Sequence, residues 1–89
     1  KFKQLQYKTY FYKKRKEYSK AITDYTEAIA LGVDNEQIRY KRGNCYFQIG
    51  KFEKAVLDYN NTLKYDPRNI NYLNNRAVAL DQLGRVMEA

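Results

Sequence analysis

The sequence predicts an all-α fold in which antiparallel helix pairs are stacked as an array. Three observations predict it: a 34-residue period, helical spacing of apolar residues within each period, and turn or capping residues between the segments. A fixed period of this kind is typical of a protein that works through an extended surface. Residues of similar size recur at that interval: Ala21, Ala55 and Ala89; Tyr18, Phe52 and Val86; Tyr12, Tyr46 and Leu80; Thr9, Gly43 and Ala77; Gly50 and Gly84.

The first period covers residues 1–35 and predicts two helices joined by a tight turn. They run from about Lys3 to Arg15 and from about Tyr18 to Leu31. Apolar and aromatic residues lie three, four or seven positions apart in these segments, as one face of a helix requires. Gly32 follows the second helix, at the usual place for a left-handed backbone conformation.

The second period covers residues 36–69 and predicts helices over about Glu36 to Ile49 and Phe52 to Tyr65. The side-chain oxygen of Asn35 can cap the first of them. Pro67 stops the second, because proline has no N–H to donate and disfavours helix in the residue before it. The loops are short, so neighbouring helices should be antiparallel.

The third period covers residues 70–89 and is truncated. Asn69 can cap a helix from about Ile70 to Leu83, which Gly84 should end. A sixth helix should begin near Val86. Because the chain opens at a lysine and stops within this pattern, we expect it to be a segment of a longer array.

The middle period resembles the tetratricopeptide repeat family, whose pattern is W-x2-L-G-x2-Y, then A-x3-F, then P, over 34 residues. It reads Arg39-x2-Arg42-Gly43-x2-Tyr46, then Ala55-x3-Tyr59, then Pro67. The chain departs from the pattern where charged residues replace apolar ones or glycine: Arg39 at the tryptophan position, Lys8, Arg42 and Arg76 at the leucine position, and Lys16 at the helix-ending glycine. The resemblance implies a right-handed superhelical solenoid of about two and a half repeats.

Composition argues against an enzyme. The chain has no histidine, one serine (Ser19) and one cysteine, and we expect Cys45 to act as a small hydrophobic residue. We also expect solvated helix faces, and no metal site or cofactor, to account for acidic residues such as Asp24, Glu27 and Asp58. A single cysteine cannot form an internal disulfide, which favours a reducing, cytoplasmic location. No apolar run is long enough to span a membrane.

In the family that the chain resembles, the first helix of each pair lines a concave groove. The period then sets Gln6, Tyr40 and Asn74 side by side, and likewise Tyr7, Lys41 and Asn75. Amides pair well with an extended backbone, tyrosines anchor, and Lys41 attracts acidic side chains. We therefore expect the groove to bind a protein or peptide segment, including an acidic one, although ordinary exposed residues would show the same pattern. The candidate partner-binding residues are Tyr7, Tyr10, Tyr40, Lys41, Asn44, Asn74 and Asn75.

A narrower alternative comes from co-chaperones of this family, which clamp the carboxyl terminus of heat-shock chaperones. Asn44 and Asn75 match two asparagines of that clamp, whereas Tyr40 stands where a lysine is needed. The clamp is therefore incomplete, because a missing cation weakens carboxylate capture.

A second alternative is nucleic-acid binding, which we disfavour. Residues 1–20 hold eight basic residues and one acidic residue, while residues 21–89 balance nine against nine, so the net charge of +7 belongs to the first segment. Its basic patch consists of Lys13, Lys14, Arg15 and Lys16, interleaved with aromatic residues as in single-strand binding surfaces. A third alternative is architectural: neighbouring repeats of a larger chain would bury both ends of the segment.

Overall fold

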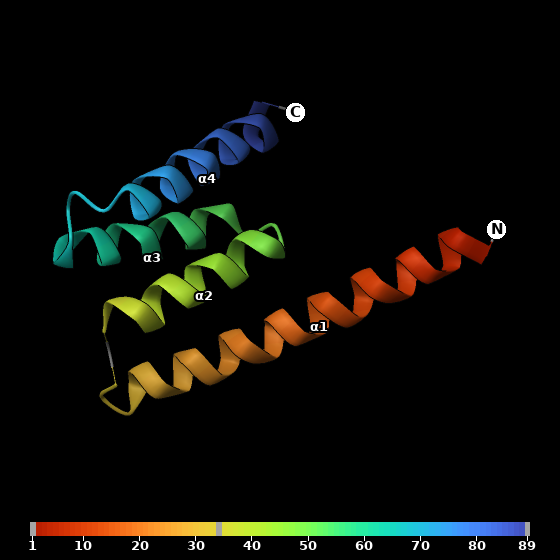
Figure 1. Ribbon diagram of the computed structural model, residues 1–89, viewed down its shortest axis with the longest axis horizontal. Coiled ribbons are helices and arrows are strands. Elements are labelled where there is room, and N and C mark those ends of the chain that lie inside the picture. The colour runs from red at the N-terminus through yellow and green to blue at the C-terminus, as the bar shows by residue number, and fades with distance from the viewer. Residues whose placement is uncertain (1, 34, 89) are drawn as a thin grey trace.

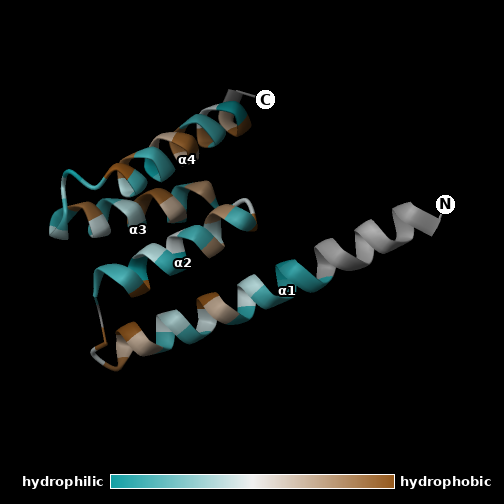
Figure 2. Ribbon diagram, in the orientation of Figure 1, coloured by the Kyte–Doolittle hydropathy of each residue, from teal (hydrophilic) through white to brown (hydrophobic). Residues whose placement is uncertain are grey.

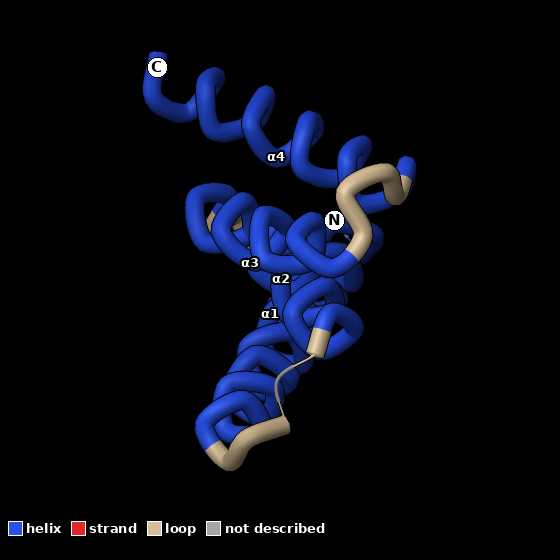
Figure 3. The backbone as a smooth tube through the Cα atoms, turned by 90° about the vertical axis from the view of Figure 1, so that its left-hand side faces the viewer, coloured by secondary structure: helices blue, strands red, loops and turns tan. Residues whose placement is uncertain are grey.

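The computed structural model describes the backbone of residues 2–33 and 35–88 and the side chains of residues 13–33 and 35–87. Within those ranges the chain forms α1 (Phe2–Ala30), α2 (Glu36–Gln48), α3 (Phe52–Tyr65) and α4 (Ile70–Glu88), and no strand. Consecutive helices are antiparallel and packed in series, with α4 at one side of the α2–α3 pair and α1 at the other (Figures 1 and 3). The predicted all-α array of helices is confirmed.

The first period departs from its prediction, because α1 is one continuous helix of 29 residues. The tight turn expected between Arg15 and Tyr18 is wrong. Lys16 stands in the register of Gly50, which follows α2 with a φ of +82°. Lysine favours the helix and disfavours that left-handed conformation, so the helix continues through this position.

The third period also contains a helix that is longer than predicted, here at its C-terminal end. The fifth predicted helix was expected to end at Leu83, yet α4 runs on to Glu88, and no separate helix begins at Val86. Gly84 does not adopt a positive φ, unlike Gly32 and Gly50. Glycine permits a left-handed backbone and does not require one.

The predicted caps of α2 and α4 are confirmed. The Asn35 side chain accepts a hydrogen bond from the Ile38 backbone N–H at 3.0 Å, and the Asn69 side chain accepts one from the Tyr72 N–H at 3.1 Å. α3 begins and ends where expected, with its last residue Tyr65 two positions before Pro67. Short polar side chains therefore set the starts of both helices that face the groove described below.

The core lies where α2, α3 and α4 meet. Ala55, Tyr59 and Ala79 are at most 1% exposed. Gly43 lets α2 approach α3 closely, because a Cβ at this position would lie 3.0 Å from Cε1 of Tyr59. Gly43 and Ala55, two of the small residues that recur with the period, thus lie where helices pack closely. Figure 2 shows that hydrophobic segments alternate with hydrophilic ones along α2, α3 and α4.

In the described part of the chain, no helix has both the length and the apolarity that a membrane span requires.

Candidate functional site

A depression of about 290 Å³ lies between α2 and α4, above α3. Side chains from α2 and α4 form its walls, and Tyr59 of α3 contributes to its floor. We call it the α2–α4 groove. The residues that line it are Asn44, Phe47, Gln48, Tyr59, Asn75 and Val78.

A hydrogen-bond network connects the polar residues of this groove. Oδ1 of Asn44 accepts from the Tyr59 hydroxyl at 2.6 Å and from Nδ2 of Asn75 at 3.3 Å. Nδ2 of Asn75 also donates to the Tyr40 hydroxyl oxygen at 2.9 Å. Nδ2 of Asn44, a donor, and Oδ1 of Asn75, an acceptor, make no hydrogen bond to another described side chain. The network thus fixes both amides and leaves one donor and one acceptor of the asparagines unused.

Tyr59 can hold this network because it stays protonated. Burial raises the pKa of its hydroxyl well above the ordinary value, and the neighbouring Tyr40 and Asp58 raise it further. The hydroxyl is therefore a permanent donor to Asn44. Cys45, the residue after Asn44, is half-buried. Burial raises the pKa of its thiol, which disfavours the reactive thiolate.

Tyr40 adjoins the groove through its hydrogen bond with Asn75. Its ring centroid lies 4.7 Å from that of Tyr72 and 6.1 Å from that of Tyr59. Tyr72 in turn donates to Glu36 at 3.4 Å, and burial and the Glu36 carboxylate raise its pKa. Tyr40 is thus held between α3 and α4, where it supports Asn75.

The structure brings together three of the predicted partner-binding residues, namely Tyr40, Asn44 and Asn75. Lys41 and Asn74 are exposed and do not line the depression. The side chains of Tyr7 and Tyr10 lie outside the described residues. Sequence reasoning missed the contributions of Phe47 and Tyr59. Tyr59 matches the aromatic position of the repeat pattern, which indicated only a core role.

The basic patch does not converge on a site. Lys13, Arg15 and Lys16 are exposed on α1, and Lys14 forms an ion pair with Glu17 at 3.5 Å. The four residues are consecutive and occupy about one turn, so their side chains point to different sides of the helix. They lie in the part of α1 that leads away from the other three helices (Figure 1).

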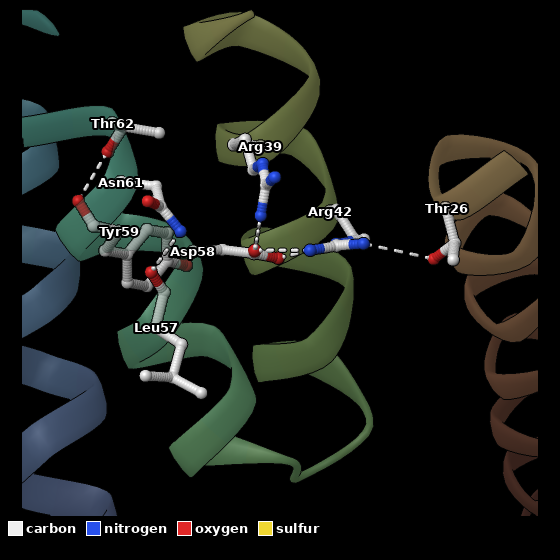
Figure 4. Close-up of polar contacts among 8 residues, drawn as sticks. All are labelled: Thr26, Arg39, Arg42, Leu57, Asp58, Tyr59, Asn61 and Thr62. Atoms are coloured by element: carbon white, nitrogen blue, oxygen red, sulfur yellow. Dashed lines mark hydrogen bonds and ion pairs between the residues drawn. The ribbon is translucent and has the colours of Figure 1, made fainter. Parts of the chain in front are cut away.

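A buried ion pair behind the groove fixes the position of α2 (Figure 4). Nε and Nη2 of Arg42 donate to the two carboxylate oxygens of Asp58 at 2.8 and 2.7 Å, and Nη1 donates to Thr26 on α1 at 3.2 Å. Arg39 lies 3.8 Å from the same carboxylate. The hydrogen bond with Asp58 raises the pKa of Arg42. The expectation that Asp58 belongs to a solvated face is wrong, because the residue is 2% exposed.

Comparisons with known proteins agree with this architecture. A family model described as TPR repeat matches residues 10–50 and 43–84. Zinc finger CCCH domain-containing protein 7B of Homo sapiens is 34% identical over 71 residues, which cover 76% of this chain and 7% of that protein. No solved structure is significantly similar.

Two further relatives are similar to part of this chain. TPR repeat-containing thioredoxin TTL4 of Arabidopsis thaliana is 36% identical over 64 residues, 72% of this chain and 9% of that protein. DnaJ homolog subfamily C member 7 homolog of Schizosaccharomyces pombe is 50% identical over 50 residues, 54% of this chain and 10% of that protein. The chain therefore spans a tenth or less of the length of these three relatives.

Proposed function

This chain belongs to the tetratricopeptide repeat family, and from that premise we propose that it is a non-catalytic module that binds a partner protein segment in the α2–α4 groove. Repeats of this family generally mediate protein–protein interaction. We place this activity in the cytoplasm, because the single Cys45 favours a reducing compartment. The groove in turn supports binding of an extended peptide backbone.

The observation that carries the proposal is the matched pair of unused groups on Asn44 and Asn75. A peptide backbone offers one C=O acceptor and one N–H donor per residue. Nδ2 of Asn44 complements the first and Oδ1 of Asn75 complements the second. Both amides are already oriented by Tyr40 and Tyr59, so binding costs little further side-chain entropy.

The remaining surface around the groove suits the same partner. Phe47 and Val78 offer apolar area for a side chain of the bound segment. The exposed Lys41 and Asn74 lie on the same two helices, where Lys41 would attract acidic residues of the partner. Tyr7 and Tyr10 were expected on this surface by their place in the repeat, but they belong to the N-terminal half of the continuous α1, whose backbone leads away from the other three helices (Figure 1), so we leave them out of the proposed surface.

The test uses peptides selected against the chain from a random display library and measured by fluorescence polarisation. Asn75→Ala should weaken their binding by about tenfold, because one hydrogen bond contributes about 1 kcal/mol and its loss leaves a backbone N–H unpaired. Asn61→Ala is the matched control, since the Asn61 side chain bonds only to the Leu57 carbonyl of its own helix. Equal affinities for wild type and Asn75→Ala, with both folded by circular dichroism, would contradict the groove assignment.

Capture of a chain-terminal carboxylate is a second candidate. It is favoured by the 3.3 Å contact between the two asparagines, Asn44 and Asn75, that match the co-chaperone clamp. The structure also shows Tyr40 packed against Tyr72 at the clamp's lysine position. Amidating the C-terminus of the selected peptides separates the candidates. Backbone binding tolerates amidation, whereas carboxylate capture should lose about tenfold or more in affinity because it loses charge-assisted hydrogen bonds.

A further inference from the structure

Both N–H groups of the Asn75 side chain are in use within the protein. A primary amide carries two N–H donors on its nitrogen and an acceptor on its oxygen. Nδ2 of Asn75 donates to Oδ1 of Asn44 at 3.3 Å and to the Tyr40 hydroxyl oxygen at 2.9 Å. What Asn75 keeps for a ligand is therefore its oxygen, an acceptor.

Asn44 presents the opposite group from the other wall of the groove. Its oxygen accepts from the Tyr59 hydroxyl at 2.6 Å as well as from Asn75. Because Tyr59 is 1% exposed, turning the Asn44 amide over would leave a buried hydroxyl proton without an acceptor. Asn44 thus offers its nitrogen, and the pair of asparagines presents one donor and one acceptor.

The described side chains that line the groove are all neutral. Lys41 is exposed and lies outside the depression, and the exposed amide of Gln48 can either donate or accept. A carboxylate at the asparagines would receive a hydrogen bond from Asn44 and would face the oxygen of Asn75 with no proton between them. A peptide link, which has one C=O and one N–H, would satisfy both groups.

Tyr40 is the residue that removes the second donor. Its hydroxyl oxygen takes the N–H of Asn75 that could otherwise turn to a negatively charged ligand. Hydrogen bonds to a carboxylate are stronger than those to a neutral group, so the loss of one donor weakens carboxylate binding most. Tyr40 itself does not line the depression, and it acts on the ligand through Asn75.

We propose that Tyr40 is a positioning residue that sets the specificity of the α2–α4 groove. Through Asn75 it makes the asparagine pair bind an internal peptide link of the partner segment and disfavour a chain-terminal or side-chain carboxylate. This inference rests on the proposed function and names the part of the partner that the asparagines bind. Acidic residues of the partner pair with Lys41, outside the depression, and the partner's carboxyl terminus lies beyond the groove.

Matched peptides that differ only at their carboxyl end test this specificity. The display-selected peptides are shortened from the C-terminus one residue at a time, and each length is made as a free acid and as an amide. The shortest amide that Asn75→Ala still weakens has its last residue at the asparagines. At that length the wild type should bind the amide at least about tenfold more tightly than the acid by fluorescence polarisation, because the acid lacks both the N–H and a second donor for its charge.

Tyr40→Phe should lower this amide-to-acid ratio by about tenfold. The variant keeps the ring and frees one N–H of Asn75, which can then donate to the acid. Tyr72→Phe is the matched control. It removes a hydroxyl from the ring 4.7 Å from that of Tyr40, but this hydroxyl donates to Glu36, so the ratio should not change. Circular dichroism checks that both variants are folded.

Three results would overturn the proposal while the groove assignment stands. They are equal binding of acid and amide by the wild type, a ratio that Tyr40→Phe leaves unchanged, and a ratio that Tyr72→Phe lowers as much as Tyr40→Phe does. An Asn75→Ala variant that binds every peptide like the wild type would instead overturn the proposed function, and this specificity with it.

Discussion

Arg42 and Asp58 illustrate how a departure from the repeat pattern is accommodated at a single contact. The pattern places leucine where Arg42 stands, and the Arg42 side chain is only 14% exposed. Burying a guanidinium is unfavourable unless a carboxylate pairs with it. Asp58, at 3% side-chain exposure, provides that partner with bidentate geometry. The two charges are therefore interdependent, and neither is expected to be tolerated alone.

Asp58→Ala should lower the free energy of unfolding by about 3–5 kcal/mol, because it leaves Arg42 buried without a partner. Arg42→Leu combined with Asp58→Leu should stay within about 2 kcal/mol of wild type, since apolar residues often replace a buried ion pair without loss. Urea unfolding followed by circular dichroism measures both. A double variant as unstable as Asp58→Ala would show that the pair adds net stability.

Tyr59 and Tyr72 should make stability depend on alkaline pH. Both are neutral when protonated, and burial raises both pKa values in the folded chain. The unfolded chain therefore loses these protons first, at a pH of about 10. Stability is fully present below that pH and falls above it, by up to about 1.4 kcal/mol per pH unit for each tyrosine.

Urea unfolding repeated across the alkaline range measures this slope. Tyr59→Phe should make it shallower, whereas Tyr65→Phe, at an exposed position of the same helix, should leave it unchanged. Tyr59→Phe also removes the hydrogen bond to Asn44. The loss of this bond lowers stability by a constant amount at every pH, so the change in slope reports only the lost titration of Tyr59. Equal slopes in wild type and Tyr59→Phe would contradict the burial argument.

At the scale of the element, the continuity of α1 depends on Lys16, which stands where the repeat pattern has a helix-ending glycine. Spin labels at Lys8→Cys and Thr26→Cys in a Cys45→Ser background should lie about 27 Å apart, because a helix rises about 1.5 Å per residue. A folded hairpin would bring them to about 10 Å, the usual distance between packed helix axes. Electron–electron resonance distances decide between the two. Lys16→Gly should broaden the distribution, since glycine costs about 1 kcal/mol in a helix interior.

Two glycines within helices should respond to alanine in opposite directions. Gly43→Ala should destabilise the chain by about 1–3 kcal/mol, because the new Cβ would lie 3.0 Å from Tyr59 and 3.1 Å from Asp58 Cβ. Gly84→Ala should stabilise α4 by about 1 kcal/mol, because nothing lies within 4 Å of its Cβ position and alanine favours the helix. Thermal unfolding measures both. The opposite order would show that α2 and α3 can separate without cost.

At the scale of the whole molecule, the helices form an elongated body with principal extents of 47, 33 and 21 Å. One core joins α2, α3 and α4. α1 packs on α2 at its C-terminal half and runs past the other helices at its N-terminal half (Figure 1).

Local features of the sequence determined the helices and much of the groove. Asn35 and Asn69 cap helices by contacts within three residues, and Pro67 acts on its nearest neighbours, so their effects could be predicted without the fold. The 34-residue period also placed Asn44 and Asn75 on the first helices of successive periods. Lys16 was recognised as a departure, but its consequence, a continuous α1, was not predicted.

Only the tertiary structure decided the burial of Asp58 and the orientation of the two amides. Asp58 on α3 can be buried because Arg42, 16 residues earlier on α2, pairs with its carboxylate. Asn75 offers its oxygen because its nitrogen is held by Tyr40 and Asn44. Such outcomes depend on which side chains meet across helices, and helix periodicity fixes the face on which a residue lies and not the partner that it finds there.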